Sequence, residues 1–402
     1  MGEDSGFQPD GVPQRADVVV AGPAAPDPPL TTEVPPSDAP DVEAPPVQGA
    51  PPDSAPLDLD QMVFTGTGAE YFRIWIVNLA LTIATLGIYS AWAKVRRLQF
   101  FYRHTRLAGA GFDYHGDPIA ILKGRMVGLV LFGLYSAMGY AGTVMTLVIL
   151  VVLAVLLPWL LGRSLRFRLH NSSYRGLRFK FHGTTKQAYW IFLAMPFFMV
   201  LSLFTLGPFW HHRLKRYQFS NAAFGRTQFG TSAEVGEFYV AHILAGILMG
   251  ALLTALIVVV ALTTVATGAG REPGTAPRTD MPPWFLPAIF LGYIFAFVGS
   301  QAITTARIQN AVWNRARLGS LGFICDLSIP RLFWIQLSNL AATVLTLGVF
   351  RPFAQVRLAR YMAGCMTLVR AVPFSAFAAA AADDVTAMGE ETAELFDFDI
   401  GF

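Results

Sequence analysis

The chain has 402 residues, of which 53% are hydrophobic and only 14% charged, and its mean hydropathy is +0.46. A typical soluble domain carries about 25% charged residues, so this composition excludes a soluble protein and predicts an integral membrane protein. The formal net charge of +3 combines an acidic beginning with a charge of −11, a basic body with +21 and an acidic end with −7.

Residues 1–60 are the first predicted region, a disordered acidic arm rich in proline. They hold 14 of the 26 prolines, together with many Ala, Asp and Glu residues. Such a segment buries too little apolar surface to offset the entropy of ordering. Residues 371–402 have the same acidic bias, and we expect a second acidic tail there. The repeated membrane domain is therefore predicted to span residues 61–370.

Three apolar segments, near residues 71–92, 188–210 and 332–353, share a Thr-Leu-Gly motif. The first and third segments match over a long motif at a constant offset of 261 residues, which also pairs Asn78 with Asn339. The middle segment matches at an offset of 120 residues but lacks the asparagine. Identities at a constant offset indicate an internal repeat.

Short alternating segments accompany the basic regions. His104–Phe112, Asn171–Phe179, Asn221–Phe229 and Asn310–Leu318 have equal lengths. Apolar and polar residues alternating beside glycine are typical of short strands, although segments this short could also be helix ends. The predicted fold class is an all-α polytopic membrane protein, internally repeated, with short cytoplasmic β-strands between helices.

Two helical hairpins, near residues 126–161 and 238–306, are the clearest candidates for crossing a membrane. Met126 to Leu161 carries no charge. One crossing helix needs about 20 apolar residues, so this run predicts two helices that turn near Gly139. A polar link at residues 271–282 is expected to join the helices of the second hairpin.

The first repeat contains an extended motif that resembles a known family. It reads Gly87-Ile88-Tyr89-Ser90-Ala91-Trp92-Ala93-Lys94-Val95-Arg96-Arg97, followed by Phe101-Tyr102 and Thr105-Arg106-Leu107. This motif resembles the YjgN-like family of bacterial inner-membrane proteins, over about residues 61–402. The resemblance implies a multi-pass protein of the bacterial inner membrane. The function of that family is uncharacterised, so the resemblance implies no catalytic residues.

The distribution of Lys and Arg separates two topologies, because cytoplasmic loops carry an excess of these residues. If all seven apolar segments cross, at least 12 of the basic residues face the wrong side. If the three Thr-Leu-Gly segments turn near their glycines and re-enter, four helices span and both termini lie in the cytoplasm. We prefer the re-entrant topology, and the seven-crossing topology is the alternative. The basic groups concerned are 94–125, 163–186, 213–226, 307–331 and 351–370.

The sequence contains no Walker A loop, no dinucleotide-binding fingerprint and no His-Glu-x-x-His motif. We therefore expect no enzyme, no cofactor and no metal site. His115 and His182 recur in matched Tyr/Phe-His-Gly endings, which we interpret as turns; a metal site formed by both is the alternative. Polar residues inside the apolar segments stabilise helix contacts or line a transport path. The candidates for such an intramembrane site are Asn78, Thr85, Asn339 and Thr346.

Basic residues interleaved with aromatic ones are expected to contact anionic lipids of the cytoplasmic face, each contributing about 1 kcal/mol. The predicted function is that of a non-enzymatic membrane-organising or lipid-contacting protein. The alternative is a channel or facilitator-type transporter that uses the re-entrant segments. We expect no nucleic-acid binding, because the basic residues flank apolar runs. The candidate headgroup contacts are Lys94, Arg96, Arg97, Arg103, Arg106, Arg166, Arg168, Arg216 and Arg357.

Overall fold

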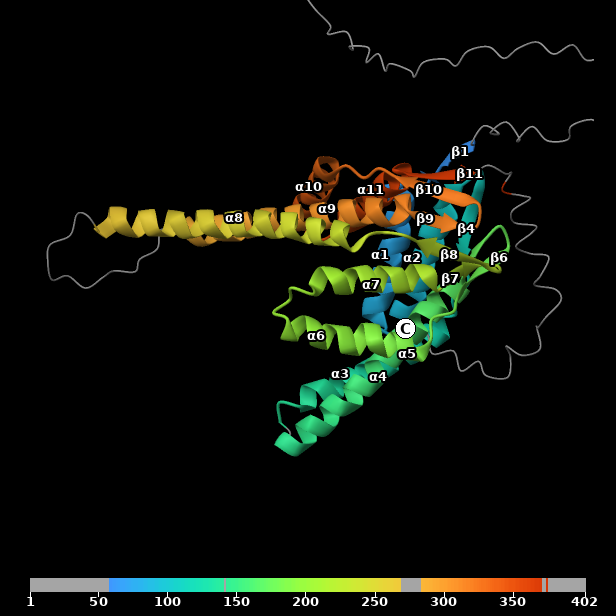
Figure 1. Ribbon diagram of the computed structural model, residues 1–402, viewed down its shortest axis with the longest axis horizontal. Coiled ribbons are helices and arrows are strands. Elements are labelled where there is room, and N and C mark those ends of the chain that lie inside the picture. The colour runs from blue at the N-terminus through green and yellow to red at the C-terminus, as the bar shows by residue number, and fades with distance from the viewer. Residues whose placement is uncertain (1–57, 141, 269–282, 371–373, 375–402) are drawn as a thin grey trace, which may run out of the picture. The chain divides into compact units, whose positions relative to one another are not determined.

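The computed structural model of the chain describes residues 58–140, 142–268, 283–370 and 374 (Figure 1). The predicted acidic arm and tail lie outside the described residues except at their inner ends, and the predicted polar link at 271–282 lies outside them completely. At the inner end of the arm, Asp58 to Asp60 belong to a strand. The folded domain therefore begins before the predicted boundary at residue 61.

Short strands build one antiparallel sheet in the described part of the chain. It has 11 strands in the order β1-β11-β10-β9-β8-β7-β6-β5-β4-β3-β2. No strand exceeds five residues, so each depends on its neighbours. The strands are β1 (Asp58–Gln61), β2 (Val63–Phe64), β3 (Thr105–Leu107), β4 (Ala110–Tyr114), β5 (Ser172–Tyr174), β6 (Leu177–Phe181), β7 (Ala222–Phe224), β8 (Thr227–Thr231), β9 (Ala316–Leu318), β10 (Leu321–Cys325) and β11 (Met366–Arg370).

The two edges of this sheet meet at Met62. β1 and β2 lie at opposite ends of the strand order, yet Met62 alone separates them in the chain. The Met62 N–H donates to the Met366 carbonyl at 2.8 Å. Arg370 of β11 forms ion pairs with Asp58 and Asp60, which fasten edge strand β1 to its neighbour. The sheet thus nearly closes on itself, which protects strand edges that would otherwise pair with other chains.

Two-residue turns connect the strands of four hairpins. The φ angle is positive at both Ala108 and Gly109, and at both Arg175 and Gly176, as a type I′ turn requires. Gly225 and Gly319 each begin their turn with a φ of 58°, as in a type II′ turn. Both turn types match the right-handed twist of the strands they join, so the local sequence favours tight hairpins.

Large side chains from several strands form a core of their own. Tyr174, Phe224 and Leu368 are almost completely buried. The ring of Phe374 lies 5.2 Å from that of Tyr174 and 6.2 Å from that of Phe224. Full burial of one such side chain contributes about 1.5–3 kcal/mol. The sheet therefore has an apolar core of its own.

The predicted fold class, an all-α protein with short strands between its helices, is wrong. The strands pair into one 11-stranded sheet that nearly closes on itself, so the sheet is a principal part of the fold beside the helices. A single hairpin is at best marginally stable in water, whereas hairpins joined in series share edges and a core. The predicted strand segment Asn310–Leu318 is also misplaced, because most of it lies in helix α9 (Phe285–Asn314) and the strands there begin at Ala316.

Among the described residues, four helices are long and apolar enough to cross a membrane. They form two side-by-side pairs (Figure 1), at the places of the predicted hairpins near 126–161 and 238–306. They are α3 (Pro118–Ala137), α4 (Thr143–His170), the Val235–Thr263 part of α8 (Val235–Gly268), and α9.

Each Thr-Leu-Gly segment forms part of a bent pair of shorter helices and not one continuous helix. The helices of each pair contact each other and point back toward the sheet (Figure 1). These three bent helix pairs are named the first, second and third hairpins in chain order. The first hairpin is α1 (Gly68–Ala84) with α2 (Ser90–His104). The second consists of α5 (Thr185–Tyr189), the π-helix η1 (Trp190–Ala194), α6 (Met195–Leu201) and α7 (Gly207–Ser220), and the third of α10 (Ile329–Leu345) and α11 (Arg351–Gly364).

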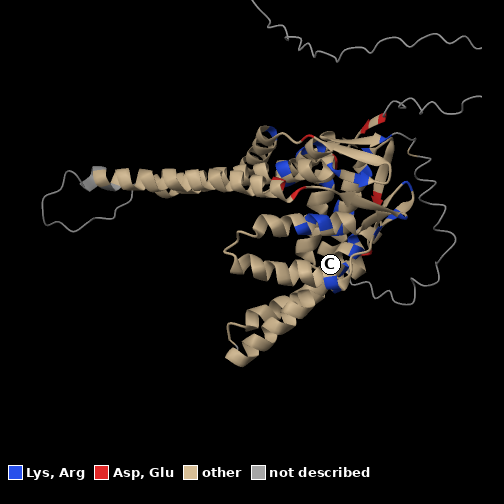
Figure 2. Ribbon diagram, in the orientation of Figure 1, with Lys and Arg blue, Asp and Glu red and all other residues tan. Residues whose placement is uncertain are grey.

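The charged residues divide the helices into two parts. Figure 2 shows that Lys and Arg gather on the parts of the helices close to the sheet, whereas the far ends are almost uncharged. Aromatic and aliphatic side chains are exposed at those far ends, among them Leu86, Leu203 and Leu347. An apolar zone at one end and a cationic zone at the other suit a protein that enters a bilayer from one side.

Candidate functional site

The turn at the tip of the first hairpin is a helix C-terminal motif with leucine in a left-handed conformation. Leu86 and Gly87 have φ angles of 49° and 94°. The Gly87 N–H donates to the Thr82 carbonyl at 2.8 Å, and the Leu86 N–H to Ile83 at 3.1 Å, as in a Schellman motif. The Thr85 hydroxyl donates to Leu81 and accepts from the Tyr89 N–H at 2.9 Å. One threonine side chain thereby joins both helices of the tip.

The third hairpin repeats this turn with Thr346, Leu347 and Gly348. The second hairpin does not form it at the Thr-Leu-Gly motif. Its left-handed residues are Leu203 and Phe204. The Ser202 hydroxyl replaces that of the threonine: it donates to the Met199 carbonyl and accepts from the Leu206 N–H. Gly207 instead begins α7. The predicted bend near the glycine is therefore misplaced in the middle segment, whereas the full internal repeat stays a prediction.

Each tip presents a leucine that almost nothing in the described chain covers. Leu86 is 96% exposed, Leu347 95% and Leu203 83%. Leaving a leucine side chain in water forgoes about 1.5–3 kcal/mol relative to burial. The tips are therefore suited to an apolar environment outside the protein.

The uncharged part of the first hairpin is about as deep as one leaflet along α1 and shorter along α2. The charges nearest its tip on each helix are Arg73 and Lys94. At 1.5 Å per residue, Arg73 lies about 17 Å before the end of α1 and Lys94 about 6 Å after the start of α2. Half of a hydrocarbon core is about 15 Å thick. In the third hairpin Arg351 lies closer to the tip, and an arginine side chain can extend toward the polar interface.

A groove lies beside each hairpin. The first groove, of about 280 Å³, lies between α1, α2 and α3; the second, of about 800 Å³, between α5, η1 and α7; the third, of about 680 Å³, between α10 and α11. Each is lined by a tryptophan and by three Lys or Arg residues. The cations are Lys94, Arg97 and Arg125 in the first groove, Lys186, Arg213 and Arg216 in the second, and Arg331, Arg357 and Arg360 in the third.

The cations of the first groove repel one another without compensation from acidic residues. Among the described residues, no Asp or Glu oxygen lies within 4.0 Å of the charged nitrogens of Lys94, Arg97 or Arg125. Burial lowers the pKa of Lys94, and the neighbouring Arg125, Arg97 and Arg168 lower it further. Arg125 donates to the Ser90 hydroxyl. Such a cluster favours an anion, which would relieve the repulsion.

The four residues of the predicted intramembrane polar site lie in two different hairpins. Asn78 lines the first groove. Asn339 bonds within the third hairpin, where its amide donates to the Ala354 carbonyl and accepts from Arg357. Thr85 and Thr346 each bond within their own tip. The hydrogen bonds of these residues therefore stabilise separate hairpins.

The predicted headgroup contacts fall into several environments. Lys94 and Arg97 line the first groove, Arg216 the second and Arg357 the third. Arg166 donates to the Gly183 carbonyl. The others lie outside the three grooves: Arg96 over the Tyr89 ring, Arg168 near the end of α4, Arg103 near the end of α2 and Arg106 on β3.

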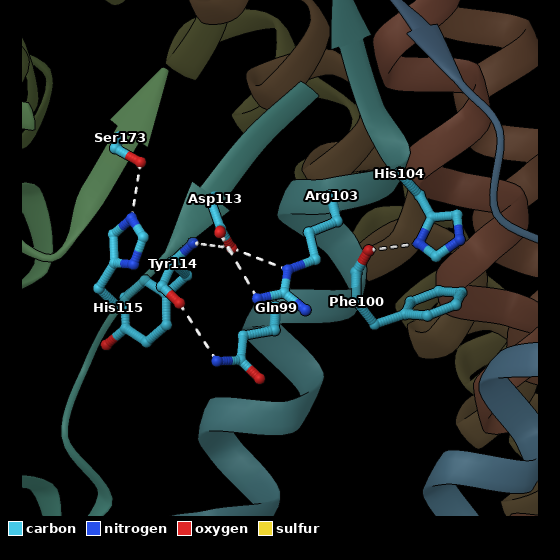
Figure 3. Close-up of polar contacts among 8 residues, drawn as sticks. All are labelled: Gln99, Phe100, Arg103, His104, Asp113, Tyr114, His115 and Ser173. Carbon is cyan, nitrogen blue, oxygen red and sulfur yellow. Dashed lines mark hydrogen bonds and ion pairs between the residues drawn. The ribbon is translucent and has the colours of Figure 1, made fainter. Parts of the chain in front are cut away.

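Arg103 is already neutralised inside the protein. Figure 3 shows its side chain directed at Asp113, with 2.9 Å between Nε and Oδ1. The same carboxylate accepts from the Tyr114 N–H, and the Gln99 amide donates to the Tyr114 carbonyl. These contacts fasten α2 to β4. Arg103 therefore has a structural role in holding the first hairpin against the sheet.

His115 and His182 directly follow the last residues of β4 and β6. His115 Nε2 lies 2.8 Å from the Ser173 hydroxyl (Figure 3). The His115 and His182 N–H groups donate to the carbonyls of Asn171 and Asn221, so each continues the pairing of the sheet by one bond. Among the described residues, no cluster of three His, Cys, Asp or Glu side chains could hold a metal ion.

Sequence reasoning missed several cations of the grooves. Arg125 lies in α3, at the start of a span, and the other missed residues are Lys186, Arg213, Arg331 and Arg360. All belong to the basic groups that the sequence shows. They lie in the same grooves as the predicted cations because of how α2, α7 and α11 pack against the other helices. No local sequence motif predicts that packing.

Comparisons with known proteins show the family of the chain. A family profile described as "Bacterial protein of unknown function (DUF898)" matches residues 60–395. The chain is 32% identical over 149 residues to "Inner membrane protein YjgN" of Escherichia coli O157:H7, and 28% identical over 146 residues to the protein of that name from Salmonella typhimurium. Each match covers 36% of this chain and 36% of the relative, so it spans about a third of either protein. No solved structure matches the chain. The predicted resemblance to the YjgN-like family is confirmed, and the chain belongs to the DUF898 family of bacterial proteins of unknown function.

Proposed function

We propose that this chain is a non-enzymatic inner-membrane protein that contacts anionic lipid, with its three bent hairpins inserted in one leaflet. The observation that carries this proposal is the pairing of an exposed leucine tip with a tricationic groove in every hairpin. The tip supplies the apolar part that enters the hydrocarbon. The groove supplies the charge that meets headgroups, each basic residue contributing about 1 kcal/mol. The relatives named as inner membrane proteins support the location.

The continuity of the sheet supports insertion from one side. β6 follows the first spanning pair and β7 follows the second hairpin, and these two strands pair directly, with Lys180 opposite Ala223. In the seven-crossing topology the regions of these strands face opposite sides of the membrane. Paired strands have neighbouring backbones about 5 Å apart, and a bilayer cannot separate them. The pairing therefore favours the re-entrant topology.

The basic groups favour the cytoplasm as the side that holds the sheet. Cytoplasmic loops are enriched in Lys and Arg, and Figure 2 shows that these residues gather near the sheet. β1 and β11 pair with each other in that sheet. The first and last strands of the folded domain thus lie side by side, and we propose that both termini lie in the cytoplasm.

The transport alternative is less well supported. A pore that uses the re-entrant segments would need Asn78, Thr85, Asn339 and Thr346 around one path. Thr85 and Thr346 are instead occupied with the helix ends of their own tips, and Asn339 is bonded to its own hairpin. Lipid contact requires no shared path between the hairpins. The proposed partners are therefore anionic lipids, with no cofactor and no nucleic acid.

Depth measurements on the full chain test the insertion. A nitroxide is attached at L86C or L347C, with native Cys325 and Cys365 replaced by alanine, and the protein is placed in nanodiscs. We expect these labels to be accessible to oxygen and shielded from a water-soluble nickel complex. Labels at the exposed sheet positions Lys180 and Ser320 are the matched controls and should react oppositely. Exposure of the Leu86 label to the nickel complex would contradict the proposal.

Thiol labelling in intact spheroplasts tests the sidedness. K180C and Q228C occupy exposed positions on β6 and β8. Both are expected to resist a membrane-impermeant maleimide until the cells are opened. Labelling of one before lysis and of the other only afterwards would restore the seven-crossing topology.

A further inference from the structure

The amide of Asn78 is a buried polar group without a partner for its oxygen. Asn78 is only 7% exposed, and among the described residues its Oδ1 accepts no hydrogen bond. Leaving a buried acceptor unsatisfied costs free energy, so such a group calls for an explanation. Asn78 also lines the first groove, so the unsatisfied amide belongs to the wall of that groove.

The matched asparagine of the third hairpin shows that the position can be satisfied internally. Asn339 Oδ1 accepts from Arg357 at 3.3 Å, and its Nδ2 donates to the Ala354 carbonyl at 3.1 Å. In the first hairpin Arg96 stands at the position of Arg357, but it lies over the Tyr89 ring. The oxygen of Asn78 is thus left for a donor from outside the hairpin.

The three cations that line the first groove favour a negatively charged ligand. Lys94 and Arg97 come from α2 and Arg125 from α3, and none of the three has a carboxylate partner among the described residues. Arg125 donates a hydrogen bond to the Ser90 hydroxyl, and both residues line the groove. Guanidinium groups bind phosphate oxygens with paired hydrogen bonds, and a lysine adds a point charge. A ligand for this groove therefore combines an anion with a hydrogen-bond donor.

We infer that the first groove binds one phosphodiester that carries a hydroxyl group, with Lys94, Arg97 and Arg125 on the phosphate and Asn78 accepting from the hydroxyl. The groove volume of about 280 Å³ lies at the lower limit of ligand sites, which suits a headgroup and not a whole lipid. A glycerol phosphodiester has this chemistry, either as phosphatidylglycerol or as free glycerophosphoglycerol. The inference rests on the proposed lipid contact and adds the headgroup that one hairpin selects.

Two lipids that differ only in the hydroxyl groups of the headgroup test the inference. The full chain is placed in phosphatidylcholine nanodiscs that contain either phosphatidylglycerol or phosphatidylpropanol, a phosphodiester with the same three-carbon headgroup and no hydroxyl. Bound lipid is counted by native mass spectrometry. We expect phosphatidylglycerol to bind roughly tenfold more tightly, the effect of one well-placed hydrogen bond. Equal binding of the two lipids by the unmodified protein overturns the inference without any variant.

Matched variants assign the selectivity to the groove. Asn78→Leu keeps the side-chain shape and should abolish the preference while phosphatidylpropanol binding persists; a retained preference overturns the assignment. Arg97→Gln should weaken both lipids, whereas Arg106→Gln removes an exposed cation on β3, outside the groove, and should leave the preference unchanged. Equal losses with Arg97→Gln and Arg106→Gln would mean that only general surface charge attracts the lipids and would overturn the inference.

Free glycerophosphoglycerol distinguishes the source of the ligand. Competition by this soluble molecule at millimolar concentration would show that the headgroup alone suffices, and absence of competition beside retained lipid selectivity would assign the site to the lipid. The failure of this inference differs from that of the proposed function. Loss of headgroup selectivity with the Leu86 label still in the hydrocarbon refutes the groove alone, whereas an aqueous Leu86 label refutes the insertion.

Discussion

Arg370 on β11 and Asp60 on β1 form an ion pair, with 2.5 Å between Nε and Oδ2, across 310 positions of the chain. Both side chains are largely buried, at 19% and 24% exposure. The pair joins edge strand β1 to its neighbour β11 and so holds in place the strand that Met62 connects to the other edge of the sheet. It therefore couples the beginning of the folded domain to its end.

Removal of the Asp60 charge should weaken this closure. We expect Asp60→Asn to lower the free energy of unfolding by about 1–3 kcal/mol, because a hydrogen-bonded charge loses its partner. Arg103→Gln is the control, since the Arg103–Asp113 pair is more exposed and such pairs contribute about 0–1 kcal/mol. Unfolding of the detergent-solubilised chain gives both values. Equal losses would mean that closure does not depend on the buried pair.

The hairpin turns should be sensitive to the loss of glycine. Gly176 has a φ of 81°, and a residue with a Cβ atom loses about 1–2 kcal/mol in this region. Gly176→Ala is therefore expected to lower stability, whereas Gly176→Asn should cost less, because asparagine tolerates left-handed backbone. Gly128→Ala in α3 is the control, since open space surrounds that position. Unfolding curves that show no difference between Gly176→Ala and Gly128→Ala would contradict the turn assignment.

The sequence predicted those parts of the fold that local patterns encode. The uncharged run from Met126 to Leu161 is too long for one helix, and the structure forms α3 and α4 there. The segments around Gly109 and Gly176 were predicted as short strands, and the structure forms two strands joined by a tight turn in each. Helix pairs and the presence of strands could thus be predicted from composition and spacing, whereas the turns inside these segments were not.

Sheet closure and the site could not be predicted in this way. Pairing of β1 with β11 joins the two ends of the domain, and no local signal reports it. In the second hairpin the Thr-Leu-Gly motif misled the prediction, because Ser202 supplies the same hydroxyl bonds three residues before Thr205. Arg125 joins the first groove only through the packing of α3 against α2. These features depend on tertiary contacts and not on periodicity.

The tip of the first hairpin should depend on a single hydroxyl. Thr85 accepts from the Tyr89 N–H and donates to the Leu81 carbonyl, so Thr85→Val removes both bonds at nearly constant volume. We expect a loss of about 1 kcal/mol, seen as faster hydrogen exchange in peptides covering the turn. Thr85→Ser keeps the hydroxyl and should retain slow exchange. Equal exchange in the valine and serine variants would show that the left-handed turn holds without the side chain.

His211 should make stability depend on pH. It lies on α7 against α8, with its ring 5.5 Å from that of Phe238 and 5.4 Å from that of His242. Burial, followed by repulsion from Lys215 and His242, lowers the pKa of His211 from 6.5 to about 4. The folded state therefore binds this proton less readily than the unfolded state. Stability is fully present above about pH 6.5, falls as the pH is lowered and levels off below about pH 4.

The full chain in detergent tests this sign. The decline between these pH values is expected to be on the order of 1–3 kcal/mol, and His211→Gln should remove most of it, because glutamine does not titrate. His170→Gln is the matched control at an exposed position on α4, and it should keep the decline. A melting temperature that falls equally with pH in the His211→Gln variant and in the unmodified chain would assign the acid sensitivity to other groups. The expected result is that the decline disappears in His211→Gln and persists in His170→Gln and in the unmodified chain. That result ties acid destabilisation to the contact between α7 and α8.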